Sequence, residues 1–373
     1  MQREFGHWDE RVAVLEGRQA PELFASFKDL PFDEQLSLVT DDETFQAWGF
    51  CQLLLKESLE AAFDDPIRAV NFAELAVKVS QNLGDAYDPH WVLDLRARAH
   101  AYLGNAQRVL GELRSAEAAF REAESLMARS MTGNPLIEAE ILHLKASLLC
   151  AQRRSEKALG LVDRALGIYR KADEPQGIGV VLLKKGKILE EAGNLDEAIR
   201  LVQEVFEKID PETEPRLALV ARYNLLTYLS LAGRYQEADE MLQKARGFFL
   251  GHARPLDLLR LQWAEGKIAI GLDRPREAEA DFRRVQEEFL ARGMGYDAAL
   301  VSLDLAILYA REHRTEDLKR LAAEILQVFE SRDVHREAVA ALILFRSACE
   351  EERLTVELAG QIATLLQRER RSK

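Results

Sequence analysis

The sequence predicts an all-α fold made of about seven to eight successive helix pairs, and three observations lead to this prediction. Glycine and proline are scarce, with 21 and 10 of 373 residues, together about 8% where an average protein has roughly 12%. Small residues recur at intervals of about 40 residues along most of the chain. No Gly/Ser-rich linker or low-complexity stretch divides the chain, so we expect one superhelical domain.

Six segments share one pattern of residue offsets, which predicts a helix–turn–helix unit in each. They begin at Gly104, Ala146, Gly186, Leu226, Gly266 and Ala306, with a step of 42 and then steps of 40 residues. We expect the small residues among these to lie where the first helix crosses its partner closely. Seven positions later a glycine or polar residue ends the first helix in the left-handed conformation; these are Gly111, Arg153, Gly193, Gly233, Asp273 and His313. Alanine then marks the crossing point of the second helix, at Ala116, Ala158, Ala198, Ala238 and Ala278.

This pattern resembles the tetratricopeptide repeat over about Asp94 to Phe329. The resemblance implies a right-handed α–α superhelix in which first helices line the concave face. The period is 40 residues, where the family usually has about 34, so we expect both helices to be a turn longer. The family's closing proline is kept plainly only as Pro211, and we expect four other prolines in loops between repeats: Pro135, Pro175, Pro215 and Pro255. Long-helix variants of this family resemble sensing or regulatory arms of bacterial proteins, although no DNA-binding segment is evident here.

The regions outside the six repeats complete the predicted organisation. Residues 1–43 are interpreted as an N-terminal helical cap or a linker, with two short helices broken by Pro21 and Pro31. Residues 44–333 form the predicted solenoid, and residues 334–373 a C-terminal capping helix pair. The terminal pairs are expected at Phe45–Phe63, with a second helix carrying Ala69, Ala73 and Ala76, and at Arg336–Glu351 with Thr355–Arg370.

The net charge and the spacing of the cysteines indicate which classes of partner are disfavoured and which cellular compartment is expected. The formal net charge is −13, which disfavours direct binding of nucleic acid or an anionic membrane. Cys51, Cys150 and Cys349 are too far apart in sequence to suggest a disulfide framework or a metal-ligand pair, so we expect a reducing, cytoplasmic location. Met1–Glu10 lacks the apolar core of a signal peptide, and Thr44–Leu55, the longest run without charge, is too short to span a bilayer. An excess of arginine over lysine hints at a GC-rich bacterial genome.

No motif predicts catalysis, a cofactor or a metal site. Gly177 and Gly179 lack the third glycine and the preceding strand of a dinucleotide site. The seven histidines are scattered and never paired at i and i+4. His143 and Cys150, seven residues apart, suggest a Cys–His nucleophile, but that spacing is also typical of two side chains on one helix face. We therefore expect a protein that is not an enzyme.

The resemblance also implies which positions could contact a ligand, because binding in this family comes mainly from the concave face of first helices. The corresponding residues are Arg98, Tyr102, Asn105, Arg108, Glu140, His143, Ser147, Lys184, Lys187, Glu190, Glu191, Tyr223, Asn224, Thr227, Arg260, Trp263, Lys267, Asp304 and Arg311.

One group of these positions combines cations, an amide and two aromatic rings, and we predict it as the binding patch. It consists of Lys184, Lys187, Tyr223, Asn224, Arg260, Trp263 and Lys267. Such side chains suit an acidic peptide segment or a terminal carboxylate. Asn224 followed by Arg260 partly resembles the family's carboxylate clamp, but Lys187 and Ala264 depart from it. The alternative is that the lysines are solvated and pair with Glu190 or Glu191.

Two functions remain open from the sequence. The first is a non-enzymatic module that binds a segment of a partner protein, or a peptide, in the concave groove. The second is a peptide-responsive regulator that acts on a separate effector. Both need a protein or peptide partner, and both are compatible with a monomer or a homodimer.

Overall fold

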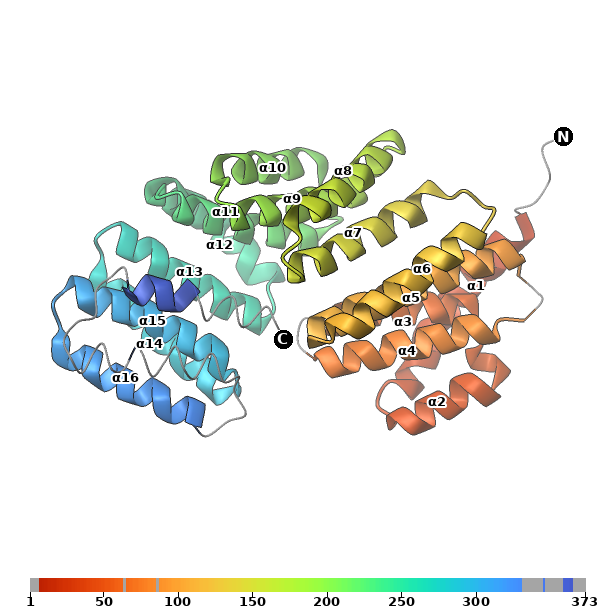
Figure 1. The fold of residues 1–373 in the computed structure, drawn as a ribbon, viewed down its shortest axis with the longest axis horizontal. Coiled ribbons are helices and arrows are strands. Elements are labelled where there is room, and N and C mark those ends of the chain that lie inside the picture. Colours follow the sequence, from red (N-terminus) through yellow and green to blue (C-terminus); the bar gives the residue numbers. More distant parts are fainter. Residues whose placement is uncertain (1–6, 63–64, 85–86, 331–344, 346–357, 365–373) are drawn as a thin grey trace. The chain divides into compact units, whose positions relative to one another are not determined.

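A computed structural model describes residues 7–62, 65–84, 87–330, 345 and 358–364. Within these residues the secondary structure is entirely helical, which confirms the predicted fold class (Figure 1). The helices are α1 (His7–Phe27), α2 (Phe32–Asp41), the 3-10 turn η1 (Glu43–Phe45), α3 (Trp48–Ala61), α4 (Pro66–Asn82), α5 (Pro89–Leu110), α6 (Leu113–Arg129), α7 (Pro135–Ala151), α8 (Ser155–Lys171), α9 (Pro175–Glu191), α10 (Leu195–Lys208), α11 (Pro215–Leu231), α12 (Tyr235–His252), α13 (Pro255–Gly271), α14 (Pro275–Ala291), α15 (Gly295–Arg311) and α16 (Thr315–Glu330). From α3 onward the described helices form seven successive pairs.

Proline marks where first helices begin. Five first helices begin with a proline: Pro89, Pro135, Pro175, Pro215 and Pro255. The expectation that the last four lie in loops between repeats is therefore wrong. Proline is favoured at this position because the first backbone N–H has no partner within a helix and the ring already holds φ at a helical value.

All six first helices of the repeat end one or two residues before the position that the pattern predicts as the left-handed cap. The residues at that position have positive φ: Gly111 (94°), Arg153 (59°), Gly193 (81°), Gly233 (72°), Asp273 (59°) and His313 (58°). The left-handed residue lets backbone N–H groups bond to carbonyls of the last helical turn, for example from Arg154 to Leu149 O at 2.8 Å. Glycine adopts this conformation without strain, whereas the three other residue types pay a steric penalty.

The small residues of the repeat lie at helix crossings, as expected, but they differ in how closely they are packed. A Cβ added at Gly266 would lie 2.5 Å from Cε1 of Phe282 on α14. At Gly104 it would lie 2.9 Å from the Phe120 ring on α6. At Gly186 the nearest atom would be 3.5 Å away, an ordinary contact. The alanines that mark the second-helix crossing are fully buried: Ala116, Ala158, Ala198, Ala238 and Ala278.

The chain divides into two compact units, Met1–Gly177 (unit 1) and Ile178–Ser372 (unit 2). Each unit repeats one packing scheme, in which a second helix lies against its own first helix and against the next one. Successive first helices also contact each other: α3 with α5 and α5 with α7 in unit 1, and α11 with α13 and α13 with α15 in unit 2. First helices are therefore the shared lining of each stack.

Helix α1 opens unit 1 and runs unbroken through Pro21, so the expected break at that residue is wrong. α1 packs on α3 at Gly49, where an added Cβ would lie 2.4 Å from the backbone carbon of Glu16. The Glu16 carboxylate also accepts hydrogen bonds from Gly49 N–H, at 3.1 Å, and from the Tyr87 hydroxyl. This close approach packs α1 tightly against the first helix pair. Pro31 precedes α2, as expected.

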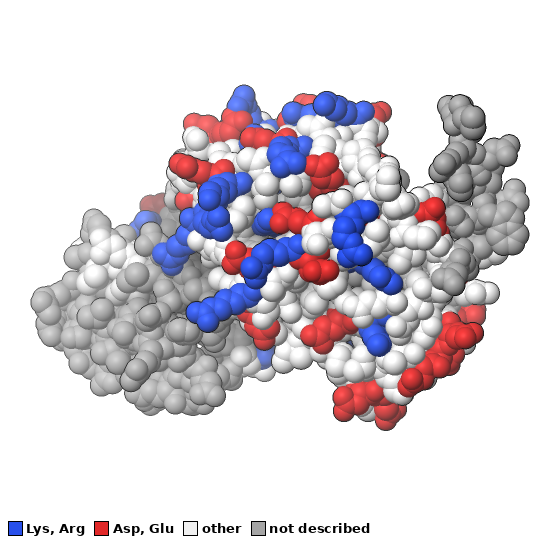
Figure 2. All heavy atoms as spheres, turned by 45° about the vertical axis from the view of Figure 1, so that its right-hand side comes forward, with Lys and Arg blue, Asp and Glu red and all other residues white. Residues whose placement is uncertain are grey.

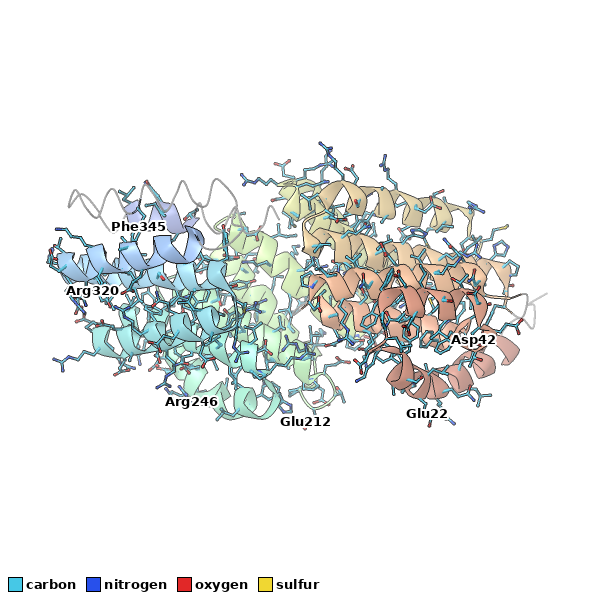
Figure 3. The ribbon with its side chains drawn as sticks, turned by 90° about the horizontal axis from the view of Figure 1, so that it is seen from below. Glu22, Asp42, Glu212, Arg246, Arg320 and Phe345 are labelled. Carbon is cyan, nitrogen blue, oxygen red and sulfur yellow. The ribbon has the colours of Figure 1, made fainter. Side chains whose placement is uncertain are left out.

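The core of unit 2 is centred on α13, α14 and α15. Phe282, Phe289 and Tyr309 are fully buried there, and the Trp263 and Phe289 rings pack edge to face with centroids 6.0 Å apart. Phe345 is also fully buried in this core (Figure 3). The predicted C-terminal pair lies otherwise mostly outside the described residues. No described helix is long and apolar enough to cross a lipid bilayer.

Candidate functional site

A hollow of about 360 Å³ lies in unit 2 among the first helices of three consecutive pairs, α11, α13 and α15. We call it the unit 2 hollow, and Tyr235 of α12 closes one side of it. Its lining residues are Tyr223, Thr227, Ser230, Leu231, Tyr235, Trp263, Ala264, Lys267, Ile270, Asp304, Ile307 and Arg311. This is the volume of a small-ligand or peptide side-chain site.

Asp304 organises the charged wall of the hollow. Its Oδ2 atom accepts a hydrogen bond from Trp263 Nε1 at 2.6 Å and lies 3.2 Å from Lys267 Nζ. The Lys267 ammonium also lies 4.6 Å from the centre of the Trp263 ring, within cation–π range. Trp263 is 9% exposed, so the indole is held rigidly while its neighbouring cation remains partly exposed.

The remaining polar groups give the hollow hydroxyls and one exposed cation. Thr227 and Ser230 lie on α11, and each hydroxyl donates to the carbonyl oxygen four residues earlier, at 3.0 and 2.8 Å. Arg311, at the end of α15, is exposed and forms no ion pair with any residue that the structure describes. With Lys267 paired to Asp304, the guanidinium of Arg311 is the cation in the lining that is available to an anionic ligand.

The structure divides the predicted patch. Tyr223, Trp263 and Lys267 line the hollow, whereas the other four residues do not: Lys184, Lys187, Asn224 and Arg260. Lys187 forms an ion pair with Glu190 on its own helix, which is the alternative considered for the lysines. Asp304 and Arg311, which occupy concave positions but were not assigned to the patch, do line the hollow. The hollow is therefore centred one repeat further toward the C-terminus than the patch.

Other predicted groove residues bind each other across neighbouring first helices. In unit 1, Arg98 of α5 donates to Glu140 of α7 at 2.7 and 3.2 Å, and the Tyr102 hydroxyl donates to the same carboxylate at 2.7 Å. Burial alone would lower the pKa of Arg98, but Glu140 raises that pKa above its ordinary value. Burial, reinforced by Glu140, raises the pKa of the Tyr102 hydroxyl. These groups join two repeats and are already satisfied.

Unit 2 has a similar bond between first helices. Arg216 of α11 forms a two-pronged ion pair with Asp257 of α13, and one prong measures 3.2 Å. A second helix is joined to the following first helix in the same way: Arg246 of α12 lies 2.7 Å from Glu265 of α13. Much of the charge on this chain therefore links successive helices.

The structure places several of the side chains that could hold a metal ion or act as a nucleophile. Among the described residues, no group of three His, Cys, Asp or Glu side chains is placed to hold a metal ion. The His143 ring packs near the Tyr169 ring, with centroids 6.3 Å apart. Cys51 is fully buried, and burial raises the pKa of its thiol to about 12, which disfavours the reactive thiolate.

The family model that matches the sequence is that of the tetratricopeptide repeat, over residues 137–208. This range covers all but the first two residues of the α7–α8 and α9–α10 pairs, each with the left-handed cap and buried alanine described above. Residues 137–208 are therefore two tetratricopeptide repeats, and the described helix pairs around them have the same arrangement. No curated protein sequence matches this repeat protein.

Three solved structures resemble the repeat protein over most of their length. A Rap protein complexed with competence and sporulation factor has a TM-score of 0.59 at 11% identity, covering 84% of this chain and 88% of that one. Aspartyl phosphate phosphatase F from Bacillus subtilis has a TM-score of 0.57 at 13% identity, covering 90% and 85%. The apo form of RapI has a TM-score of 0.55 at 14% identity, covering 96% and 98%. At these identities the likeness concerns the fold alone.

Proposed function

We propose that this repeat protein is a non-enzymatic interaction module that binds an extended peptide segment of a partner in the unit 2 hollow. The observation that carries the proposal is the lining, in which three consecutive first helices present aromatic, hydroxyl and charged side chains to one space. Because Trp263 and Asp304 are held in place by their hydrogen bond, little ordering would be needed on binding.

The chemistry of the lining indicates the class of peptide. Trp263, Ile270 and Ile307 form an apolar wall that suits an aliphatic or aromatic side chain. Arg311 suits a carboxylate, either the peptide's C-terminus or an acidic side chain, through two parallel hydrogen bonds. An acidic peptide therefore remains the expected ligand, with Arg311 in place of Lys187 and Arg260 as its principal anchor.

A peptide-responsive regulator is the second candidate, and one comparison favours it. The similar Rap structure was solved complexed with competence and sporulation factor. By analogy, a peptide bound here would act on a separate effector by changing the packing of successive first helices. One structural neighbour is named a phosphatase, and among the residues that the structure describes no cluster of His, Cys, Asp or Glu is placed to hold a metal ion. Hydrolysis of an acyl phosphate by the purified chain would contradict the non-enzymatic proposal.

Peptides selected from a random library displayed with free C-termini provide the test. We expect selected peptides to change the fluorescence of Trp263 and to bind with an affinity that Arg311→Glu weakens about tenfold, the loss of one charge-assisted contact. Arg284→Glu, an exposed cation on α14 outside the hollow, is the matched control and should leave the affinity unchanged. Equal affinities for wild type and Arg311→Glu would refute the hollow as the binding site.

A second comparison separates the hollow from the patch predicted on the sequence. The triple variant Lys187→Glu, Arg260→Glu and Lys267→Glu should abolish binding if the patch is used, with helicity retained. If only the hollow is used, Lys267→Glu alone should account for its whole effect. Small-angle scattering with and without peptide then distinguishes the two functions, because a regulator changes its profile on binding and a rigid scaffold does not.

A further inference from the structure

Unit 1 contains a second hollow, of about 490 Å³, between the second helices α6 and α8. We call it the unit 1 hollow. Both second helices pack on α7, which supplies the floor between them. Phe120 and Leu148 lie fully buried beneath this floor, and Leu149 and the half-buried Leu161 reach its surface. The hollow is thus an apolar channel bounded on two sides by helices.

Five cations rim the unit 1 hollow in a chain whose net charge is −13. They are Arg121 of α6, Lys145 of α7, Arg154 in the turn before α8, and Lys157 and Arg164 of α8. Figure 2 shows lysine and arginine side chains gathered on one face of the molecule with acidic side chains among them.

Three of these cations are available to a ligand. Lys145 pairs with Glu124, and Arg164 lies 2.7 Å from Glu138. Within the part of the chain that the structure describes, Arg121, Arg154 and Lys157 form no ion pair; Arg154 donates only to the amide oxygen of Gln152, at 3.3 Å. Arg121 and Lys157 lie on the opposite sides of the apolar floor, α6 and α8.

We propose that the unit 1 hollow docks an acidic amphipathic helix from a separate protein. An apolar floor with a cation on each side is complementary to an apolar stripe flanked on both sides by carboxylates, which is the surface of such a helix. Phosphate backbones would meet the same cations, but they offer nothing to the apolar floor. The docking site is independent of the peptide site, because it uses second helices of unit 1 and none of the residues of the unit 2 hollow.

The probe is a synthetic helix of about 18 residues, or five turns. Leucine occupies positions i, i+4, i+7 and i+11, glutamate flanks that stripe, and both ends are blocked. A second peptide carries lysine in place of every glutamate, and a third has the acidic composition in scrambled order. We expect the full-length protein to bind the acidic amphipathic peptide, with an affinity that falls as salt is added, and to bind the other two at least about tenfold more weakly.

Gly160 allows the hollow to be filled without disturbing the fold. It lines the hollow, and a Cβ added there would meet no atom within 4 Å. Gly160→Trp should therefore leave helicity and melting temperature unchanged while weakening binding of the acidic peptide about tenfold. Gly167→Trp is the matched control: Gly167 lies on the same helix, has the same free space and does not line the hollow.

Charge reversal tests the rim separately. The triple variant Arg121→Glu, Arg154→Glu and Lys157→Glu should weaken binding about tenfold or more, since several charge pairs are lost together. The control reverses three exposed cations on second helices of unit 2: Lys244, Arg276 and Arg284. It makes the same change in net charge and should alter affinity less than twofold.

Four outcomes would overturn the proposal. These are no measurable binding of the acidic amphipathic peptide, equal binding of the scrambled or basic peptide, unchanged affinity of Gly160→Trp, and equal losses in the two charge-reversal variants. Binding to vesicles of anionic lipid that depends on the same three cations, with no binding of the acidic peptide, would assign the hollow to a membrane surface instead.

Discussion

Replacement of Gly266 by alanine should destabilise the protein, and the structure supplies the magnitude. The new Cβ would lie 2.5 Å from Cε1 of Phe282 and 2.8 Å from Cδ1, about 1 Å closer than an optimal carbon–carbon contact. Phe282 is fully buried, so the ring can move only by displacing other core side chains. Overpacking of this kind costs about 1–3 kcal/mol.

The same substitution also stabilises helix α13 itself. Alanine in place of a mid-helix glycine improves helix stability by about 1 kcal/mol. The net expectation for Gly266→Ala is a loss of up to about 2 kcal/mol of unfolding free energy, with a fall in melting temperature of roughly 2–4 °C per kcal/mol for a unit of this size. Gly186→Ala adds a Cβ whose nearest contact is at 3.5 Å, so it causes no overpacking. This substitution should therefore raise the free energy of unfolding by up to about 1 kcal/mol.

The assay is chemical denaturation followed by circular dichroism, with the two variants and wild type compared at one pH. Both glycines lie in unit 2, so departures from two-state unfolding, which repeat arrays often show, affect both variants alike. The opposite signs of the two shifts are the prediction. If Gly266→Ala is as stable as wild type, or if Gly186→Ala is destabilised equally, then close approach at the repeated small residue does not govern the packing.

Three further predictions follow from single contacts. Asp273→Gly removes the strain of a left-handed residue with φ of 59°. It should raise the free energy of unfolding by up to about 1 kcal/mol, and with it the melting temperature. Gly233→Ala should lower the free energy of unfolding by a similar amount. The pKa of Glu279 is lowered below the ordinary value of 4.5, mainly by hydrogen bonds from Arg314. A carboxylate with a lowered pKa stabilises the folded protein above pH 4.5, and this stability is lost on acidification. Glu279→Gln should therefore cost about 1 kcal/mol at pH 7 and nothing in strong acid, as measured by thermal melts across pH. Glu140→Gln should lower the free energy of unfolding in urea by about 2–3 kcal/mol, because it leaves the Arg98 guanidinium without its carboxylate. The Arg98 side chain is only 22% exposed. A loss below about 0.5 kcal/mol would contradict a structural role for that pair.

The repeat was predictable because it rests on interactions within one helix pair. A left-handed cap at Gly193 and a buried alanine at Ala198 are both set by residues only a few positions away. Their spacing therefore appears directly in the sequence. The helix that continues through Pro21 was not predicted, since α1 packs on Gly49 of another helix and such a contact is not encoded in the local sequence.

The lining of the unit 2 hollow was predicted less well for a related reason. Position in the repeat correctly placed Trp263 and Lys267 on the lining of one hollow, since every first helix faces the same side of its stack. It did not show that Lys267 is neutralised by Asp304 or that Arg311 is left exposed. Those outcomes depend on how far one helix is shifted along its neighbour, and a shift of one turn changes which carboxylate a lysine reaches.

The recurrence of small and capping residues at intervals of about 40 residues was thus sufficient to predict the fold class, the helix caps and the crossing residues. This is because local sequence encodes local backbone geometry. The pairing of charges between repeats, such as Arg216 with Asp257 at a separation of 41 residues, came from packing. A repeat pattern specifies which face a side chain occupies. The distance between side chains on successive helices is set by the contacts of the whole core, and it decides which cations remain for a partner.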